Sequence, residues 1–259
     1  MAPIIALYPG QGSQKQGMAI DLYQASAKVR NLFELASDIA GRNLYALLSE
    51  GSEEELTAHA QTAITLASRS AQVRLTELGI QSHVHSGFSL GELSAYASAN
   101  IFNDETLFTI VQRRTALMDE MSARARETLG ELGMAAVIGL DHQTVHQLLL
   151  ELNLPSLYAA NDNAPNQVVV SGLSESIAQA KAAFLEKGAK RFIPLKVSGP
   201  FHTPFMEEAT QPFRTFLDEL EMTDPKDLVI SSVDGSPITN VRQAREHLSQ
   251  QLARPVRWT

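Results

Sequence analysis

Apolar positions along the chain alternate between two spacings, one typical of strands and the other of helices. Short apolar runs predict buried strands at residues 3–8 and 80–86. Residues 28–39 and 56–78 instead repeat apolar side chains at helical spacing, and a glycine follows each stretch where a helix can end. Because strands alternate with helices, this part of the chain predicts a parallel sheet that helices cover on both faces.

The pattern changes in the middle of the chain. The predicted order there is strand, helix, strand, strand, helix, strand, which is typical of a ferredoxin-like module. The predicted strands are residues 134–140, 156–160, 167–171 and 190–197, the helices are 141–152 and 174–187, and the turn between the central strands is 161–165. We therefore expect an α/β protein in which residues 1–130 and 198–259 form a larger core and residues 131–197 form an inserted subdomain.

Composition narrows the functional classes. The chain has 259 residues, a formal net charge of −8 and no cysteine. An acidic chain is a poor match for a phosphate backbone, so we expect no nucleic-acid partner. The lack of cysteine excludes disulfides, thiolate metal ligands and a cysteine nucleophile. No stretch approaches the ~20 apolar residues of a membrane span, and no basic segment precedes the first apolar run, so we expect a cytoplasmic protein without a membrane partner.

A Gly-x-Ser-x-Gly pattern, typical of a nucleophile elbow, occurs at Gly87-Phe88-Ser89-Leu90-Gly91. It lies between a predicted strand and a predicted helix. In such an elbow the serine occupies a tight turn, and side chains at the glycine positions would clash with neighbouring backbone. The turn exposes the Ser89 hydroxyl beside a helix N-terminus, where backbone N–H groups can stabilise an oxyanion. Ser89 is therefore a candidate nucleophile.

An arginine occupies the middle of an apolar helix face. Arg114 lies one turn after Ile110 and one turn before Met118. A buried arginine is unfavourable unless an anion pairs with it. That anion is either an internal carboxylate such as Glu92, or the carboxylate of a substrate, which a guanidinium binds through two parallel hydrogen bonds. The spacing leaves both interpretations open.

Two loops at strand-to-helix junctions supply further candidates. Residues 9–14 contain two closely spaced glycines, which indicate either a plain turn or a backbone that approaches a ligand closely. This loop lacks the lysine and the spacing of a phosphate loop. His202 precedes a predicted helix, at a position comparable with that of Ser89. His83 and His85 alternate on a strand without a nearby acidic residue, so we expect no metal site.

Together these segments resemble the malonyl-CoA:acyl-carrier-protein transacylases and the acyltransferase domains of fatty-acid and polyketide synthases. The matching segments occur in family order along the whole chain, at residues 9–14, 87–92, 112–114, 161–168, 199–202 and 251–258. The resemblance implies a hydrolase-like core with a central parallel sheet that carries the ferredoxin-like subdomain. It also implies that malonyl-CoA and acyl carrier protein are the partners and that no cofactor is needed, and we expect a monomer.

The resemblance further implies a role for each site residue. Ser89 would carry the acyl group as an ester, and His202 would act as general base and then as general acid. The backbone or side chain of Gln251 would orient His202, as an aspartate does in a hydrolase triad. The remaining residues implied are Gln11 and Leu90 for the oxyanion hole, Arg114 for the free malonyl carboxylate, and Phe88, Phe201 and Asn161 beside the substrate.

Two features depart from the family pattern. Phe88 stands where the family usually has a histidine beside the nucleophile, and this removes a polar group from the entrance of the implied site. Family members also normally continue for a further strand and helix beyond the Pro-Val-x-Trp segment at 255–258, whereas this sequence ends at Thr259. We expect a chain without those elements to expose apolar surface.

Two other functions are compatible with parts of the pattern. A serine thioesterase or esterase acting on acyl-CoA shares the Gly-x-Ser-x-Gly motif, but it needs an acid between Ser89 and His202. Asp162 is the candidate, and its predicted place in a turn of the small subdomain argues against that role. Arg114 would also have no obvious role in a simple esterase. A non-catalytic interaction protein is the other alternative, and its Ser89 would fail to become acylated.

Docking of a carrier protein places a further demand on the surface. Carrier proteins of the implied family are acidic, and this chain is acidic as well, so docking needs a local basic patch. The candidate patches are Arg124 with Arg126, and Lys187 with Lys190 and Arg191.

Overall fold

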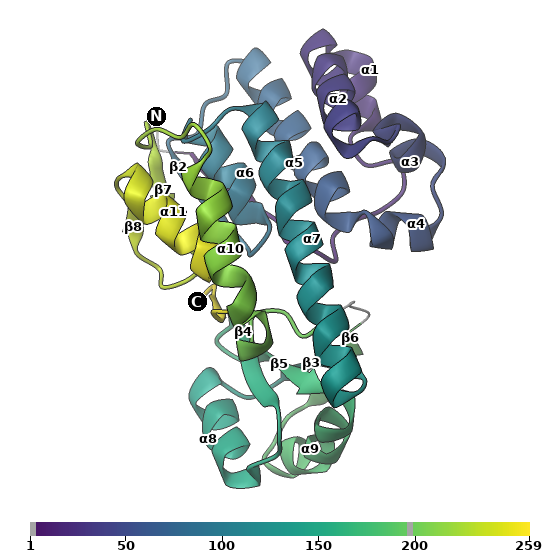
Figure 1. The fold of residues 1–259 in the computed structure, drawn as a ribbon, viewed down its shortest axis with the longest axis vertical. Coiled ribbons are helices and arrows are strands. Elements are labelled where there is room, and N and C mark those ends of the chain that lie inside the picture. The colour runs from purple at the N-terminus through teal and green to yellow at the C-terminus, as the bar shows by residue number, and fades with distance from the viewer. Residues whose placement is uncertain (1–3, 196–198) are drawn as a thin grey trace. The chain divides into compact units, whose positions relative to one another are not determined.

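The computed structural model describes residues 4–195 and 199–259 and divides into two compact units. The first unit contains the chain up to Thr115 together with Leu217–Ser232 and Ser236–Arg245. The second unit contains Ala116–Phe216, Val233–Gly235 and the chain from Glu246 onward. Three helices contribute residues to both units, and Figure 1 labels them as α7 (Asp104–Leu129), α10 (Glu207–Asp218) and α11 (Val241–Gln250).

A four-stranded sheet organises the first unit. Its order is β1-β2-β7-β8, in which β1, β2 and β7 are parallel and β8 is antiparallel to β7. The strands are β1 (Ile5–Tyr8), β2 (Val84–Gly87), β7 (Leu228–Ile230) and β8 (Pro237–Ile238). Helix α6 (Gly91–Ser98) follows β2 directly and packs against β1 and β2. The predicted parallel sheet is confirmed for three strands, and the antiparallel edge strand β8 was not predicted.

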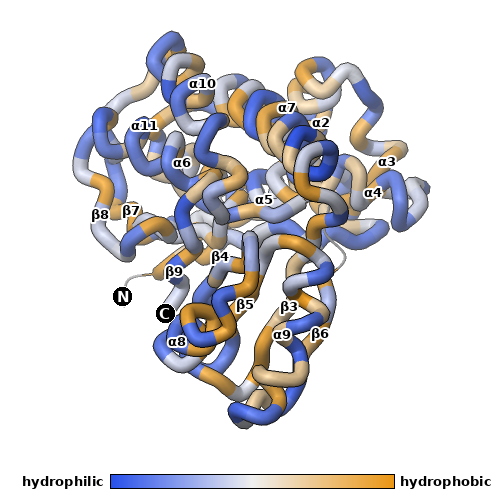
Figure 2. Tube along the Cα trace, turned by 60° about the horizontal axis from the view of Figure 1, so that its bottom comes forward, coloured by the Kyte–Doolittle hydropathy of each residue, from blue (hydrophilic) through white to orange (hydrophobic). Residues whose placement is uncertain are grey.

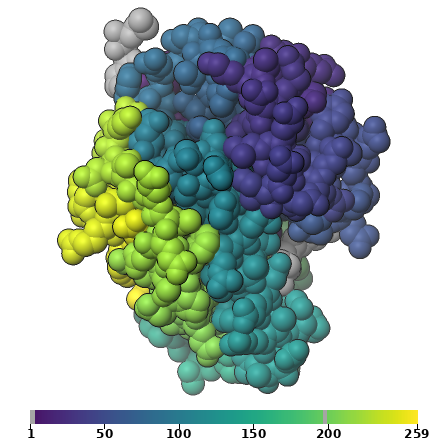
Figure 3. Space-filling model, turned by 45° about the horizontal axis from the view of Figure 1, so that its top comes forward, coloured from purple at the N-terminus to yellow at the C-terminus, as the bar shows by residue number. Residues whose placement is uncertain are grey.

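The helices that precede β2 share a core of their own. They are α1 (Ile20–Ala25), α2 (Ala27–Ala40), α3 (Leu44–Glu50), α4 (Glu53–Ala58) and α5 (Ala60–Glu77). Their buried cluster includes Val29, Phe33, Leu48 and Leu66, and Figure 3 shows the first helices together on one face, in purple. The helix predicted at 28–39 is confirmed. The stretch 56–78 is two helices rather than one, because the chain turns at His59.

Strand β1 is not the buried strand that the sequence predicts at residues 3–8. Ile5 and Leu7 are 59% and 63% exposed, because β1 is an edge strand whose only strand partner in the described part of the chain is β2. An apolar groove along the same edge is lined by Leu7, Met18 and Leu75, among others. Residue 3 lies outside the described residues. The strand predicted at 80–86 begins only at Val84, and Ile80 before it is exposed.

The ferredoxin-like module predicted from the sequence is present in the second unit. Its sheet has the order β6-β3-β5-β4-β9, with antiparallel pairing except between β4 and β9, which are parallel. The elements are β3 (Leu132–Ile138), α8 (His142–Leu152), β4 (Leu157–Ala164), β5 (Gln167–Leu173), α9 (Ser174–Glu186), β6 (Arg191–Leu195) and β9 (Val256–Arg257). The order of the first six elements confirms the predicted βαββαβ pattern.

Two details of the module differ from the sequence prediction. The turn predicted at 161–165 is wrong, because Asn161 to Ala164 belong to β4. Two register shifts between β4 and β5 accommodate these polar residues within the strand. The C-terminal strand β9 was not predicted, and it extends the sheet beside β4. Residues 196 and 197 of the last predicted strand lie outside the described residues. The predicted division at 130/131 and 197/198 stays a prediction.

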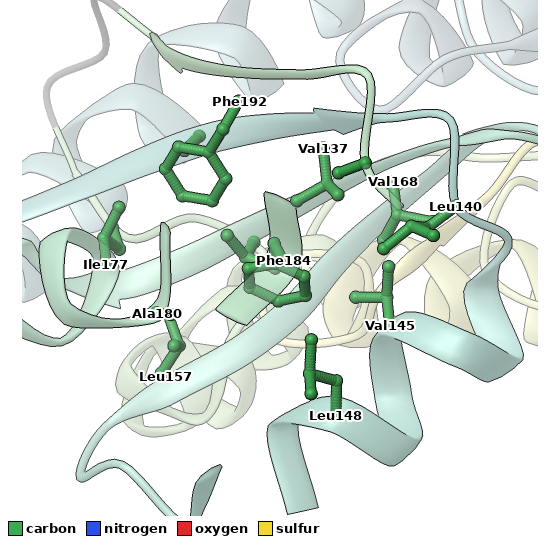
Figure 4. Close-up of a cluster of buried hydrophobic side chains, with 13 residues drawn as sticks. Val137, Leu140, Val145, Leu148, Leu157, Val168, Ile177, Ala180, Phe184 and Phe192 are labelled. Carbon is green, nitrogen blue, oxygen red and sulfur yellow. The ribbon is translucent and has the colours of Figure 1, made fainter. Parts of the chain in front are cut away.

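Helices α8 and α9 cover one face of this sheet with an apolar core. Figure 4 shows Val137 and Val168 from the strands facing Val145, Leu148 and Phe184 from the helices. Phe184 stacks on Phe192 of β6 with ring centroids 5.8 Å apart. Figure 2 shows the matching hydrophobic stretches along β3 and β5. On β3, Ala135 and Val137 face this core, and on β5, Val168 and Val170 do, so alternate residues of each strand supply it.

Residues 4–195 and 199–259 lack two features. No helix there is long and apolar enough to cross a membrane. No group of three or more histidine or acidic side chains gathers there in a way that could hold a metal ion.

Candidate active site

The Gly-x-Ser-x-Gly segment forms a tight turn between β2 and α6. Ser89 has a φ of 49°, in the left-handed region that side chains other than glycine rarely adopt. A Cβ atom on Gly87 would overlap the backbone of Gly91 and Glu92, and one on Gly91 would overlap the backbone of Tyr8 and Pro9. Both glycines are therefore required for β1, β2 and α6 to meet at Ser89. The turn confirms the elbow geometry predicted from the pattern.

The loop after β1 passes beside this elbow. A Cβ atom on Gly10 would lie 2.7 Å from the Phe88 ring and 2.8 Å from the Phe88 carbonyl oxygen. Gln11 therefore comes directly after Gly10, whose backbone lies against the elbow. Leu90 is the N-cap residue of α6. The oxyanion-hole role of these two residues stays a prediction. Phe88, where the family usually has a histidine, is half-buried and packs against the loop.

Arg114 lies directly beside the elbow serine. Its side chain is 1% exposed. Its Nη2 atom donates a hydrogen bond to Ser89 Oγ at 3.1 Å, and its Nη1 atom donates one to Gln61 Oε1 at 2.6 Å. Burial lowers the pKa of Arg114 to about 10, and attraction to the Glu92 carboxylate opposes that change. The guanidinium therefore remains charged at neutral pH.

Gln61 is a site residue that the sequence analysis missed. It lies at the start of α5, is 5% exposed and accepts the 2.6 Å hydrogen bond from Arg114. The residues from Ala60 to Leu66 are all buried, so this end of α5 has no solvent-facing side on which a glutamine could lie. A glutamine among such neighbours is the signal that could have identified it, because a buried amide needs a hydrogen-bond partner.

Glu92 accepts buried hydrogen bonds from two hydroxyl groups. Its carboxylate is 0% exposed. One oxygen accepts a hydrogen bond from the Tyr96 hydroxyl at 3.2 Å, and the other accepts one from the Ser232 hydroxyl at 2.7 Å. Tyr96 and Ser232 come from α6 and from the segment after β7, so the carboxylate is held from two sides. The attraction between Arg114 and Glu92 supports the internal-carboxylate interpretation, and the binding of a substrate carboxylate by Arg114 stays a prediction.

In the second unit, His202 is held by backbone carbonyl groups. Its Nδ1 atom lies 2.9 Å from the Gln251 carbonyl oxygen and 3.1 Å from that of Arg254. Its backbone N–H donates to the Leu252 carbonyl oxygen at 3.1 Å. Because a carbonyl oxygen only accepts hydrogen bonds, Nδ1 carries a proton in this arrangement. His202 has a φ of 60°, so its backbone is strained like that of Ser89.

The contact described between Gln251 and His202 is made by the backbone carbonyl of Gln251, and the orienting role of Gln251 stays a prediction. The Arg254 carbonyl was missed, and no side-chain pattern could have found it because any residue supplies a carbonyl. Two acceptors at Nδ1 occupy the position that an acid takes in a hydrolase triad. Asp162, the acid considered for an esterase, lies within β4, and its backbone carbonyl accepts the Trp258 N–H at 3.0 Å.

The remaining predicted residues of the second unit are buried. Phe201 is 6% exposed and Asn161 is 9% exposed. Asn161 lies in β4, where it is the register partner of both Val169 and Val256. Its buried side-chain oxygen has no hydrogen-bond partner in the described part of the chain. Such an oxygen is expected to have a polar partner such as water or substrate. The substrate-binding roles of both residues stay predictions.

Comparisons with known proteins identify the family. The model of the acyl transferase domain matches residues 6–259. Malonyl CoA-acyl carrier protein transacylase of Bacillus subtilis is 36% identical over 264 residues, which cover 100% of this chain and 81% of that protein. The protein of the same name from Escherichia coli is 33% identical over 263 residues, covering 100% of this chain and 84% of that protein. The chain therefore belongs to the acyl transferase family and is an acyltransferase.

Solved structures agree with the family and with the fold. The malonyl CoA-acyl carrier protein transacylase of Coxiella burnetii superposes with a TM-score of 0.92 at 31% identity, covering 99% of this chain and 81% of that chain. A malonyl-transacylase solved in complex with an acyl carrier protein of a type II polyketide synthase gives a TM-score of 0.92 at 33% identity, covering 99% and 83%. These similarities confirm the predicted α/β fold class.

Proposed function

We propose that the chain transfers a malonyl group from malonyl-CoA to the phosphopantetheine thiol of acyl carrier protein, supplying extender units for fatty-acid or polyketide synthesis. The observation that carries the proposal is the buried Arg114 guanidinium, 3.1 Å from Ser89 Oγ. A fixed positive charge at this distance from the nucleophile suits an acyl group that ends in a carboxylate. The names of the relatives support the same substrate and acceptor.

In the first half of the proposed reaction, Ser89 Oγ attacks the thioester carbonyl carbon of malonyl-CoA. His202 Nε2 accepts the serine proton as the C–O bond forms. Backbone N–H groups of Gln11 and Leu90 would stabilise the oxyanion of the tetrahedral intermediate. The C–S bond then breaks, and the CoA sulfur leaves with the proton that His202 returns.

In the second half, the carrier thiol gives its proton to His202 and attacks the malonyl-serine ester. The C–O bond to Ser89 breaks, and Ser89 Oγ recovers the proton. Because CoA leaves before the carrier thiol attacks, the kinetics are expected to be ping-pong. One thioester is consumed and another is formed, so the exchange is nearly balanced in free energy.

Arg114 accounts for the selectivity of the proposed reaction. A malonyl ester on Ser89 would bring a carboxylate to the guanidinium, which can bind it through two charge-assisted hydrogen bonds. An acetyl ester has no carboxylate and cannot form these hydrogen bonds, so the site should prefer malonyl by the free energy that they contribute.

The rival function is hydrolysis of acyl-CoA. It shares Ser89 and His202, but it gives no role to a buried arginine beside the nucleophile. The backbone partners of His202 favour neither function by themselves. The molecule that accepts the acyl group distinguishes hydrolysis from transfer. A hydrolase releases free malonate, whereas the proposed transferase passes the acyl group to a thiol.

Of the two candidate docking patches, the structure supports the one formed by Lys187, Lys190 and Arg191. These side chains are exposed and have no ion pair among those found in the described residues. In the other patch, Arg124 pairs with Glu120 and Glu208 at 2.8 and 3.3 Å. The charge of Arg124 is therefore already balanced by these two carboxylates. We propose that the patch of Lys187, Lys190 and Arg191, which we call the lysine patch, binds the acidic carrier protein.

Intact-mass spectrometry after brief incubation with malonyl-CoA tests the proposal. We expect one malonyl adduct on the wild-type chain, no adduct on Ser89→Ala, and loss of the adduct when holo carrier protein is added. Steady release of malonate without transfer would instead establish the hydrolase. Absence of both adduct and turnover would indicate the interaction protein. The cytoplasmic location, the monomeric state and the independence from cofactors stay predictions.

A further inference from the structure

Glu92 is a buried charge that the proposed reaction does not use. Its side chain is completely buried, and both carboxylate oxygens accept hydrogen bonds from hydroxyl groups. It lies in the first turn of α6, one turn after Ser89, and its backbone N–H donates to the Ser89 carbonyl oxygen at 3.0 Å. Neutral hydroxyl groups solvate this carboxylate but cannot balance its charge, and a buried charge is unfavourable unless an opposite charge pairs with it.

The positive charge that can balance Glu92 is Arg114. Both side chains are buried in the first unit, and both belong to the surroundings of Ser89, Arg114 through its hydrogen bond to Oγ and Glu92 through the helix turn. Attraction to Glu92 raises the pKa of Arg114, against the lowering that burial produces. The Glu92 carboxylate therefore stabilises the charged form of Arg114.

We propose that Glu92 is a positioning residue that acts as the resident counter-anion of Arg114 and thereby sets how strongly the site prefers a carboxylate-bearing acyl group over an uncharged one. This inference rests on the proposed function. An acyl carboxylate that reaches Arg114 meets a cation whose charge is already balanced in part. The acyl carboxylate therefore gains less binding free energy than it would from an uncompensated cation, and Glu92 also repels it. Glu92 thus weakens malonyl binding and stabilises the empty site.

For turnover, this means that the site recognises the malonyl group without binding it too tightly. A cation without its resident anion would bind the malonyl group more strongly in every state along the reaction. Uniform binding of this kind lowers KM without raising kcat. Tyr96 and Ser232 are the groups that fix the carboxylate, so they act on selectivity only through the position of the Glu92 charge.

Single-turnover acylation by malonyl-CoA and by acetyl-CoA, followed by intact mass over a range of concentrations, tests the proposal. In Glu92→Gln we expect the malonyl-over-acetyl selectivity to rise about tenfold, mainly through a lower half-saturation concentration for malonyl-CoA. The matched control is Glu105→Gln, the same change in the first turn of α7 on the surface, and it should leave the ratio unchanged. Ser232→Ala keeps the charge and should change the ratio much less than Glu92→Gln.

Two results for Glu92→Gln would overturn the proposal. An unchanged malonyl-over-acetyl selectivity would show that Glu92 has a purely structural role. A lower selectivity would show that Glu92 helps malonyl to bind. If Glu92→Gln does not fold, thermal unfolding of the double variant Glu92→Gln/Arg114→Gln decides. The double variant should be more stable than Glu92→Gln alone, because it lacks the uncompensated cation. A double variant no more stable than the single one would also overturn the proposal. If the wild type forms no malonyl adduct, the proposed function fails, while this comparison of stabilities still tests the pairing.

Discussion

In the proposed function, the buried charge of Arg114 defines the substrate class. The guanidinium is 1% exposed and donates to both Gln61 and Ser89. A lysine could not replace it, because a single ammonium lacks the planar fork that reaches a glutamine, a serine and a carboxylate together. The selectivity of the site therefore depends on geometry as well as on charge.

Replacing Arg114 by glutamine should convert a malonyl-selective site into an unselective one. We expect kcat/KM for malonyl-CoA to fall about 100-fold, the size of loss typical when a polar ligand group loses its charged partner. The value for acetyl-CoA should change little, since acetyl makes no use of the charge. Steady-state kinetics with both substrates measure this. Equal losses for the two substrates would show that Arg114 maintains the elbow rather than recognising the acyl group.

Residue-scale features differ in how visible they are in the sequence. Ser89 and Arg114 could be found from local sequence patterns. Ser89 lies between the two glycines of the elbow motif, and Arg114 is a charged residue on an otherwise apolar helix face. The Arg254 carbonyl that helps to hold His202 could not be found, because the contact uses no side chain. The resemblance to the family implied a role for Gln251, and the structure shows that its backbone carbonyl contacts His202.

At the scale of single elements, β2 ends at the nucleophile elbow but also carries a buried histidine. His85 is 0% exposed, its Nδ1 atom lies 3.2 Å from the Tyr8 hydroxyl, and its Nε2 atom lies 3.9 Å from Asp227 Oδ2. Burial lowers the pKa of His85, Arg69 and His83 lower it further, and Asp227 raises it without reversing the direction. The neutral imidazole is therefore the native form.

The lowered pKa of His85 predicts a loss of stability in mild acid. The unfolded chain, with a histidine pKa of about 6.5, binds this proton more readily than the folded chain does. Stability from this residue is therefore complete above that pH and falls as the pH drops below it. Thermal unfolding at pH 7.5 and pH 5.5 should show a smaller pH effect in His85→Asn than in the wild type. The exposed His142→Asn should retain the wild-type pH effect, and a His85 variant with the full effect would contradict the prediction.

The errors made at this scale have physical causes. The apolar run at β1 predicts burial, but burial also depends on whether a strand has neighbours on both sides, which composition does not encode. The polar residues Asn161 and Asp162 resemble a turn, but pairing with both β5 and β9 keeps them in β4. In both cases long-range pairing determines the outcome rather than local preference.

For the molecule as a whole, a net charge of −8 makes local charge decisive for docking. Reversing two charges in the lysine patch, Lys187→Glu with Lys190→Glu, should raise KM for carrier protein about tenfold, because like charges then face each other. Reversing Arg124 and Arg126 changes the net charge by the same amount but alters residues that already face acidic partners. We expect a smaller effect from that control pair.

Transfer to free pantetheine separates docking from chemistry in this experiment. Both pairs of variants should keep the wild-type rate with this small thiol, which needs no protein surface. Equal changes in KM for the two pairs would show that only total charge matters. A loss of transfer to pantetheine in the lysine variants would mean that the patch supports the fold or the reaction instead.

The carbonyl partners of His202 have a consequence for how acyl groups pass through the site. A carboxylate would place a negative charge beside the ring, whereas two carbonyl oxygens orient the ring through Nδ1 without a formal charge. In the proposed reaction this ring serves both halves of an exchange between two thioesters of nearly equal free energy, and a catalyst accelerates both directions of such an exchange alike. The flow of acyl groups through such a site would then follow the relative supply of the two thiol carriers.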